Sequence, residues 1–243
     1  MHDELSPIAL FFKKQRNSIQ RRISGRKTYY DAQRFVATDE VSGKLQADIL
    51  FQAGLKPDSH VLEIGCGCLS AGAFLIRFLD PGHYVGIDPN EWLRETAFAL
   101  PVNGNLCADK KPEFLGNMEF DASELGRKFD FMLSHSILSH ASAEQLPLFL
   151  NNTAKVLAPG GRIFASLILA EGNEYGNPGS PDNQDTNDKD WVYPGVSCFT
   201  RATVDRLAAE AGLKATYRPD LTKMMTAKRK LEVHDWFEFT SSV

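Results

Sequence analysis

A glycine-rich stretch at residues 61–72 constrains the fold of this chain more than any other feature of the sequence. An apolar run that contains one carboxylate leads into Gly65 and Gly67, and small residues follow them. This order predicts a strand, a tight loop and the beginning of a helix. Glycines let the backbone turn sharply and let a ligand approach it closely, and free N–H groups at the start of a helix favour polar or anionic groups. We therefore expect this loop to hold a small ligand.

The composition limits the classes of protein to which the chain can belong. With 243 residues, of which 43% are hydrophobic and 24% are charged, it can bury the core of one large domain. The net charge of -4 argues against nucleic acid as the main partner. No apolar run reaches the ~20 residues that cross a bilayer, and polar residues interrupt the N-terminal apolar stretch. We therefore expect neither a transmembrane segment nor a secretory signal.

The cysteines give no sign of a metal site or of a disulfide framework. Cys66, Cys68, Cys107 and Cys198 form no C-x-x-C pair and no zinc-like set with the histidines. The simplest interpretation is a reducing, cytoplasmic setting. The expected metal content is therefore none.

Apolar runs alternate with helical patterns along the middle of the chain. Strands are predicted at residues 60–65, 84–88, 113–120, 129–134 and 162–169, with helices over 70–79, 91–100 and 142–157 between them. A helix over 201–211 and two last strands at 214–218 and 232–240 follow. This rhythm predicts an α/β fold with a doubly wound, parallel sheet.

Two variable segments flank this regular region. Residues 5–24 read as a helix with a basic face, and residues 1–40 are predicted to form an N-terminal helical lid on a domain of residues 41–243. The basic face is either simply solvated or attracted to an acidic substrate or membrane. A second helix is predicted over 40–54. Residues 171–198 include a long stretch rich in Gly, Asn, Pro and Asp, which we expect to be an active-site lid.

Several motifs together resemble class I S-adenosylmethionine-dependent methyltransferases. The run Glu63-Ile64-Gly65-Cys66-Gly67 resembles the first motif of that family, and Gly86-Ile87-Asp88 resembles its second-strand acid. Further matches are Phe120-Asp121-Ala122, Phe129-Asp130-Phe131, the segment 134–140 and Leu157-Ala158-Pro159-Gly160-Gly161-Arg162. They cover roughly residues 60–170 in the family's order. The resemblance implies a Rossmann-like, seven-stranded and mostly parallel sheet with helices on both faces.

The resemblance also implies the residues that hold the cofactor, S-adenosylmethionine, and its product, S-adenosylhomocysteine. Glu63 would supply negative charge near the cofactor's ammonium, Asp88 would accept from the ribose hydroxyls, and Asp121 would accept from the adenine amino group. The full candidate set is Glu63, Gly65, Cys66, Gly67, Asp88, Pro89, Asp121, Ala122 and Ser134. Leu69 stands where the family has its last motif glycine, so the close backbone approach there is in doubt.

The chemistry of methyl transfer suggests further candidates. An acceptor hydroxyl must lose a proton, and His135 and His140 lie just beyond strand four, at the edge where such folds bind ligands. If residues 136–140 are helical, Ser136 and His140 share a face. Tyr29, Tyr30 and Trp191 are candidates for contact with the substrate. The remaining histidines, His2, His60, His83 and His234, are expected at surface or terminal positions.

These patterns favour a methyltransferase that acts on a small molecule, most simply on a hydroxyl. The segment after strand four lacks the Asn/Asp-Pro-Pro-Tyr/Phe tetrapeptide of enzymes that methylate nucleobase or amide nitrogens. The alternatives are N- or C-methylation, a cofactor-binding protein without catalysis, a methyltransferase of proteins or lipids, and a nicotinamide-dependent oxidoreductase, for which Asp88 would be the ribose acid. The acceptor and the oligomeric state are left open.

Overall fold

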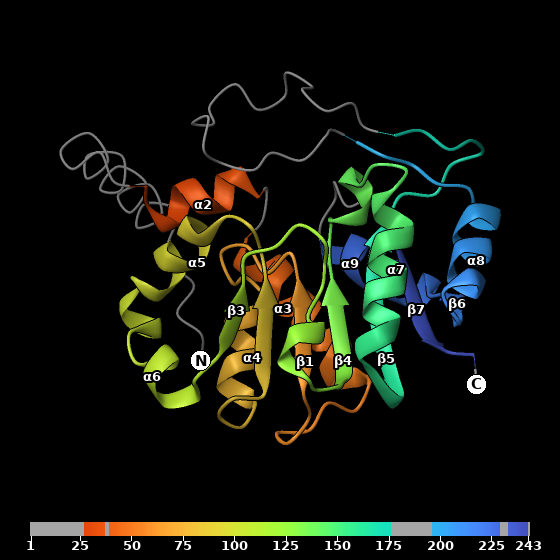
Figure 1. The fold of residues 1–243 in the computed structure, drawn as a ribbon. Coiled ribbons are helices and arrows are strands. Elements are labelled where there is room, and N and C mark those ends of the chain that lie inside the picture. The colour runs from red at the N-terminus through yellow and green to blue at the C-terminus, as the bar shows by residue number, and fades with distance from the viewer. Residues whose placement is uncertain (1–26, 37–38, 176–195, 229–232, 243) are drawn as a thin grey trace.

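The computed structural model describes residues 27–36, 39–175, 196–228 and 233–242, and in it a seven-stranded sheet lies between helices (Figure 1). The strands are β1 (Val61–Ile64), β2 (Tyr84–Ile87), β3 (Glu113–Leu115), β4 (Phe129–Ser134), β5 (Leu157–Leu167), β6 (Leu213–Tyr217) and β7 (Asp235–Ser241). The α-helices are α2 (Tyr29–Phe35), α3 (Glu40–Gln52), α4 (Gly72–Phe78), α5 (Glu91–Phe98), α6 (Leu106–Lys110), α7 (Gln145–Val156), α8 (Arg201–Glu210) and α9 (Pro219–Lys228). Short 3₁₀ turns occupy Pro101–Asn103, Ser123–Leu125 and Leu138–His140.

The strand order is β3-β2-β1-β4-β5-β7-β6, which confirms the predicted mostly parallel sheet. β1 pairs in parallel with both β2 and β4, whereas β7 runs antiparallel to β5 and β6. The chain reverses its winding at β1 and β4, because the strands before and after this pair extend the sheet in opposite directions. The carboxyl ends of β1 and β4 are therefore a topological switch point, where such sheets bind ligands.

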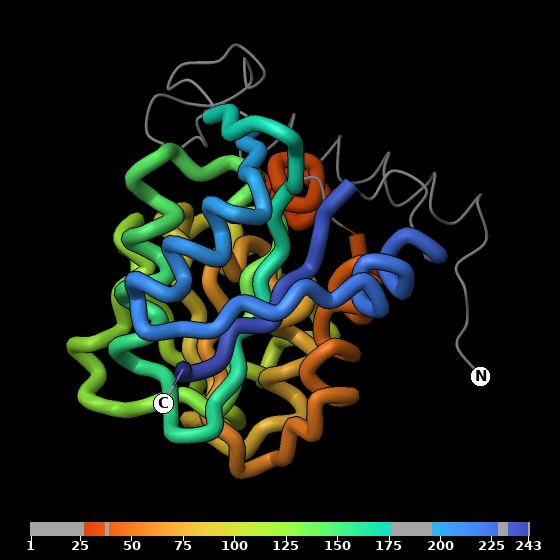
Figure 2. The backbone as a smooth tube through the Cα atoms, turned by 90° about the vertical axis from the view of Figure 1, so that its right-hand side faces the viewer, coloured from red at the N-terminus to blue at the C-terminus, as the bar shows by residue number. Residues whose placement is uncertain are grey.

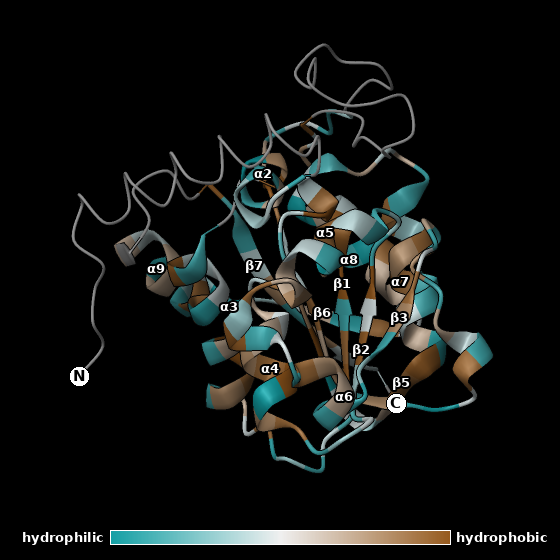
Figure 3. Cartoon of the chain, turned by 90° about the vertical axis from the view of Figure 1, so that its left-hand side faces the viewer, coloured by the Kyte–Doolittle hydropathy of each residue, from teal (hydrophilic) through white to brown (hydrophobic). Residues whose placement is uncertain are grey.

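Each face of the sheet carries its own apolar core. One core packs α7 and α8 against residues such as Met132, Ile163 and Phe237. The other packs α3, α4 and α9 against residues such as Leu133 and Trp236. Figure 3 shows hydrophobic residues along the strands and on the helix faces that meet them. Within the described part of the chain, no helix is long and apolar enough to cross a membrane.

The structure corrects several details of the predicted elements. Residues 158–161 are not a separate turn, because β5 begins at Leu157 and pairs with β4 through a register shift. Helix α9 was not predicted, since its polar sequence shows little hydrophobic periodicity, yet it buries Leu221 and Met225. The apolar side chain of Val41, in the first turn of α3, does not join the core, because it is 55% exposed. The helix predicted over 5–24 lies outside the described residues.

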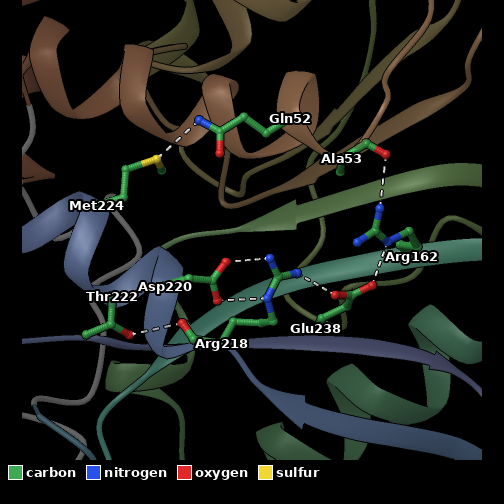
Figure 4. Close-up of polar contacts among 8 residues, drawn as sticks. All are labelled: Gln52, Ala53, Arg162, Arg218, Asp220, Thr222, Met224 and Glu238. Atoms are coloured by element: carbon green, nitrogen blue, oxygen red, sulfur yellow. Dashed lines mark hydrogen bonds and ion pairs between the residues drawn. The ribbon is translucent and has the colours of Figure 1, made fainter.

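An ion-pair network fastens α9 to the sheet beside α3 (Figures 2 and 4). Glu238 on β7 accepts from Arg162 Nε and from Arg218 Nη1, each at 2.5 Å. Arg218 also forms a bidentate pair with Asp220 on α9, and Arg162 Nη1 donates to the carbonyl of Ala53 beyond α3. The two guanidinium groups hold the pKa of Glu238 below its usual value, although burial opposes them. The bidentate pair with Asp220 fixes the orientation of α9, and the bond from Arg162 to Ala53 holds the end of α3 beside it.

Helix α3 touches the glycine-rich loop through a residue that has no side chain. A Cβ at Gly43 would lie 2.1 Å from the carbonyl oxygen of Ser70. The buried side of α3 is correspondingly small and polar, with Ser42, Gly43 and Gln46 next to Ala47. The helix can therefore lie directly against the loop after β1.

We predict that Gly43→Ala destabilises the protein by about 2 kcal/mol or more, although alanine in a helix interior normally gains about 1 kcal/mol over glycine. The reason is the backbone of Ser70, which cannot move without displacing the loop. Urea unfolding measures the difference, with Lys44→Ala on the exposed side of α3 as the control. A stabilised Gly43→Ala variant would show that the helix does not approach the loop so closely.

Candidate functional site

The glycine-rich loop has the strained backbone that its sequence suggests, including at the position that lacks glycine. Gly65 and Gly67 have φ values of +75° and +47°, and Leu69 has φ +58°. A left-handed conformation costs a non-glycine residue roughly 1–2 kcal/mol. Leu69 is only 1% exposed, and its side chain belongs to the core beneath α3 and α4. Leu69 therefore adopts the left-handed backbone that a third glycine would adopt, and burial of its side chain offsets part of the cost.

Glu63 lies beneath this loop rather than at its surface. The residue is 5% exposed, and Tyr84 donates a 2.5 Å hydrogen bond from its hydroxyl to Glu63 Oε2. A Cβ at Gly72 would lie 2.9 Å from the same oxygen, so glycine is required where α4 begins. Burial raises the pKa of Glu63 to about 8, and the charge of Asp88 adds to this effect while the Tyr84 hydrogen bond opposes it. An ammonium group nearby would stabilise the ionised form.

Asp88 joins the end of β2 to the glycine-rich loop. Its Oδ2 accepts from the backbone N–H of Gly67 at 3.0 Å, and its Oδ1 accepts from the N–H of Asn90 at 2.8 Å. The residue is 5% exposed, and burial raises the pKa of its carboxyl to about 6 against these two hydrogen bonds. The second lone pair on each oxygen can still accept from a ligand hydroxyl.

An apolar pocket opens beside this carboxylate. Its lining consists of Gly65, Ile87, Pro89, Asn117, Met118, Phe120 and Ile137. The side chain of Ile137 occupies the space beside Gly65, because a Cβ there would lie 2.1 Å from Ile137 Cδ1. Asp121 follows the lining residue Phe120 in the chain. Its Oδ1 accepts from the N–H of Ser123, and that bond is the chief cause of its lowered pKa. Ala122 is fully buried in the core next to it.

The described part of the predicted N-terminal lid lies over the glycine-rich loop. Tyr29 stands at the start of α2 beside Cys68 and Ser70 of the loop, and burial raises the pKa of its hydroxyl above the usual value. Val36 after α2 reaches to within 3.5 Å of the position of a Cβ on Gly67. Tyr30, the neighbouring candidate, is partly buried in α2. α2 thus covers one side of the loop.

The carboxyl end of β4 carries Ser134, its last residue, and His135, the first residue beyond it. Ser134 is fully buried, and its hydroxyl has no hydrogen-bond partner within the described part of the chain. His135 turns toward α3, where its Nδ1 lies 3.1 Å from Gln46 Nε2, and its ring stacks on Trp236 of β7 at 5.5 Å. Cys66 is buried in the same apolar core as Trp236, and a Cβ on Gly86 would lie 2.8 Å from its Sγ.

The prediction that Ser136 and His140 share a helical face is wrong. Ser136 has φ +60°, and only Leu138–His140 form a 3₁₀ turn, so no regular helix connects the two. The N–H of Ser136 donates to Ser166 Oγ at 2.9 Å, which holds the unusual backbone in place. His140 is partly buried at the end of the turn.

His234 is a third histidine near the end of β4. It directly precedes β7, yet its Nε2 lies 3.0 Å from Ser139 Oγ and its ring is 5.0 Å from that of His135. Its neighbour in sequence, Asp235, is tied to Tyr217 and to the N–H of Leu169. No local motif marks His234, because the pairing of β7 with β5 is what brings it to the end of β4.

Both ends of the predicted 171–198 loop are anchored at the same edge of the sheet. Glu174 and Cys198 form an antiparallel bridge, and the N–H of Ser197 donates to the carbonyl of Ser139 at 2.7 Å. The Ser197 hydroxyl donates to Ala141 O at 2.5 Å. The loop therefore leaves and rejoins the fold beside the segment after β4, while Trp191 lies outside the described residues.

Comparison with known proteins identifies the class of domain that this fold and loop define. Residues 62–163 match the family model of the methyltransferase domain. This range runs from β1 into β5 and includes Glu63, Asp88 and the segment after β4. The match is therefore confined to the central, strand-and-helix region of the chain that holds the glycine-rich loop.

Solved structures support the same class at the level of the fold. Magnesium protoporphyrin IX methyltransferase from Synechocystis PCC 6803, solved with bound S-adenosylmethionine, has a TM-score of 0.56 at 15% identity and covers 100% of this chain and 99% of that chain. The CcbJ methyltransferase from Streptomyces caelestis has a TM-score of 0.57 at 17% identity, over 89% and 98% of the two chains. Mitomycin 7-O-methyltransferase MmcR has a TM-score of 0.55 at 16% identity, over 83% of this chain and 54% of that chain. The fold is that of the S-adenosylmethionine-dependent methyltransferases.

A curated protein also resembles this chain in sequence. An uncharacterized protein of Methanocaldococcus jannaschii is 26% identical over 160 residues, which are 65% of this chain and 38% of that protein. The chain therefore matches less than half the length of this relative. The comparison adds no statement about activity.

We predict that Leu69→Gly is more stable than Leu69→Ala by about 1 kcal/mol, because glycine tolerates the left-handed backbone of this position. Both variants lose the buried side chain and should be less stable than the parent protein by roughly 2–5 kcal/mol. Leu75 in α4 is the control, since it is fully buried in regular helix and should show the opposite order of the two variants. Chemical denaturation measures all four. Equal stability of the two Leu69 variants contradicts the strain.

We predict that Glu63→Gln stabilises the protein at pH 8.5 by roughly 2–4 kcal/mol and has little effect at pH 5. The pKa of Glu63 is raised from 4.5 to about 8, so the folded protein favours the protonated carboxyl. The Glu63 carboxyl of the unfolded chain ionises above about pH 4.5, whereas that of the folded protein stays protonated up to about pH 8, so the free energy of unfolding falls over this range. Glutamine does not ionise and therefore removes this loss, and its amide oxygen can still accept from Tyr84. Denaturation at both pH values measures it, with exposed Glu95→Gln as the control. A gain that is equal at both pH values would refute the raised pKa.

Proposed function

We propose that the protein transfers a methyl group from S-adenosylmethionine to a small-molecule acceptor, most simply to a hydroxyl. The observation that carries this proposal is the placement of buried Asp88 between the glycine-rich loop and an apolar pocket, within the range that matches the methyltransferase domain. Several structurally similar proteins are methyltransferases by name, and one of them is a 7-O-methyltransferase.

The residues present fit the proposed cofactor. The buried Glu63 carboxyl suits an ammonium group, because a cation would lower the free energy of its ionised form. Asp88 can accept from two ribose hydroxyls through its remaining lone pairs. The pocket of Ile87, Pro89 and Ile137 suits the flat adenine ring, and Asp121, next in the chain to the lining residue Phe120, is the candidate to accept from its amino group. The hydroxyl of Ser134 is a further candidate, because it is buried without a partner among the described residues.

The cofactor, when bound, supplies an activated methyl group with a good leaving group. The protein must then align the acceptor with the methyl group, exclude water and accept a proton from an attacking hydroxyl. α2 and the two ends of the 171–198 loop lie at the edge of the sheet where they could enclose an acceptor. His135 and His140, both after β4, stay the candidates for the proton acceptor, and Tyr29, Tyr30 and Trp191 stay candidates for contact with the substrate.

We predict that calorimetric titration detects micromolar binding of S-adenosylmethionine and S-adenosylhomocysteine but not of NADH. Asp88→Asn should weaken both affinities by about 10- to 100-fold, because it removes a charged acceptor of two hydrogen bonds. Asp109→Asn, on an exposed position of α6, is the matched control. Radiolabelled methyl transfer to a panel of phenols, hydroxy acids and sugars then identifies the acceptor class. Tight NADH binding without S-adenosylmethionine binding would favour an oxidoreductase instead.

A further inference from the structure

Three polar side chains form a line from the end of β4 to β7. Ser136 Oγ lies 3.4 Å from Ser139 Oγ, and Ser139 Oγ lies 3.0 Å from His234 Nε2. Ser139 is 1% exposed, whereas Ser136 and His234 are partly exposed at the two ends of the line. The serine-to-serine distance is long for a hydrogen bond, as is common for catalytic contacts before a substrate tightens them. The line therefore connects one accessible end with another through a buried hydroxyl.

Ser136 lies beside the proposed cofactor site. It follows His135 and precedes Ile137, whose side chain contacts the position of a Cβ on Gly65 and lines the apolar pocket. β4 is the parallel neighbour of β1, so its carboxyl end and the glycine-rich loop lie at the same edge. Ser136 also keeps a left-handed backbone of φ +60°, which only a few non-glycine residues adopt and which is frequent at functional sites.

We propose that Ser136, Ser139 and His234 form a proton relay that accepts the proton of the acceptor hydroxyl, an inference that rests on the proposed methyl transfer. A serine hydroxyl has one proton, so each serine can donate only one hydrogen bond and must accept from its other neighbour in the line. Ser139 donates to His234 Nε2 and can then only accept from Ser136. Ser136 contacts the acceptor hydroxyl, Ser139 passes the proton from Ser136 onward, and His234 receives it at Nε2.

The balance of the step is complete within these groups. The acceptor O–H bond breaks as its proton passes to Ser136 Oγ, the proton of Ser136 passes to Ser139, and that of Ser139 passes to His234 Nε2. The acceptor oxygen forms the new C–O bond while the methyl–sulfur bond breaks, and the electron pair of that bond remains on sulfur. The imidazolium of His234 afterwards loses its proton to water at the partly exposed end of the line.

His135 does not compete for this role in the placement that the structure shows. Its Nδ1 faces the amide nitrogen of Gln46, which has only protons to donate, so Nδ1 accepts and Nε2 carries the ring proton. In that tautomer both ring nitrogens of His135 are occupied, since Nδ1 accepts from Gln46 and Nε2 already carries a proton, so neither can take the proton of the acceptor hydroxyl. The ring of His135 lies 5.0 Å from that of His234, and His135 is the titratable group that faces His234 from the end of β4. The carboxylate of Asp235 accepts from the Tyr217 hydroxyl and from the N–H of Leu169.

Nitrogen-15 NMR of the histidine-labelled protein tests the relay without any acceptor. We expect His234 to be the Nδ1–H tautomer at neutral pH, with an Nε2 that accepts a hydrogen bond. Ser139→Ala should shift the Nε2 resonance, whereas Ser139→Thr should keep it. Ser142→Ala, which removes a hydroxyl that donates to Glu144 instead, is the matched control. A His234 whose Nε2 carries the proton would overturn the relay, because Nε2 could not then receive one.

Kinetics with the acceptor from the screen test the catalytic step separately. Ser139→Ala and His234→Gln should each lower kcat by about 100-fold and abolish the solvent deuterium isotope effect, with unchanged cofactor affinity. Ser136→Gly should lose kcat similarly while its thermal stability stays equal or rises, since glycine relieves the backbone. Ser142→Ala, whose hydroxyl donates to Glu144 outside the line, should retain the parent kcat. Normal turnover of Ser139→Ala overturns the relay alone, whereas a parent protein that binds no S-adenosylmethionine overturns the proposed function.

Discussion

The close approach of neighbouring backbone to the loop after β1 is the constraint on which the rest of the structure depends. At Gly43 a side chain would strike the carbonyl of Ser70, and at Gly65 it would strike Ile137. At Gly72 it would meet Tyr84 and Glu63. These three contacts join α3, the end of β4 and β2 to a single loop. A displacement of any one of them would move the loop, because a packed core transmits small shifts instead of absorbing them.

The loop also determines the electrostatics around it. Glu63 and Asp88 are both buried close to it, and burial is the largest cause of the raised pKa of each. Two buried carboxyls near each other lower stability, since each disfavours the ionisation of the other. Natural chains retain such costs chiefly at functional sites. The arrangement therefore agrees with a site that is completed by a positively charged ligand.

The sheet could be predicted from sequence because its strands are short apolar runs bounded by turn residues, as at residues 84–88 and 129–134. Helix α9 could not, since only two of its apolar side chains, Leu221 and Met225, are deeply buried and its other residues are mostly polar. The buried face of α3 is also hard to predict, because apolar Val41 is exposed whereas Ser42, Gly43 and Gln46 are buried. Its contact with the loop requires small residues, and a hydrophobic pattern does not reveal them.

Local patterns along the chain were enough to predict the class of fold, the place of the glycine-rich loop and the candidate carboxylates, because these depend on residues close together in sequence. Which groups meet at the end of β4 could not be predicted in this way. His234 reaches Ser139 across 95 positions, and Gln46 reaches His135 across 89. Such contacts arise from strand order and helix packing, since the pairing of β7 with β5 and the position of α3 bring together residues that no local pattern relates.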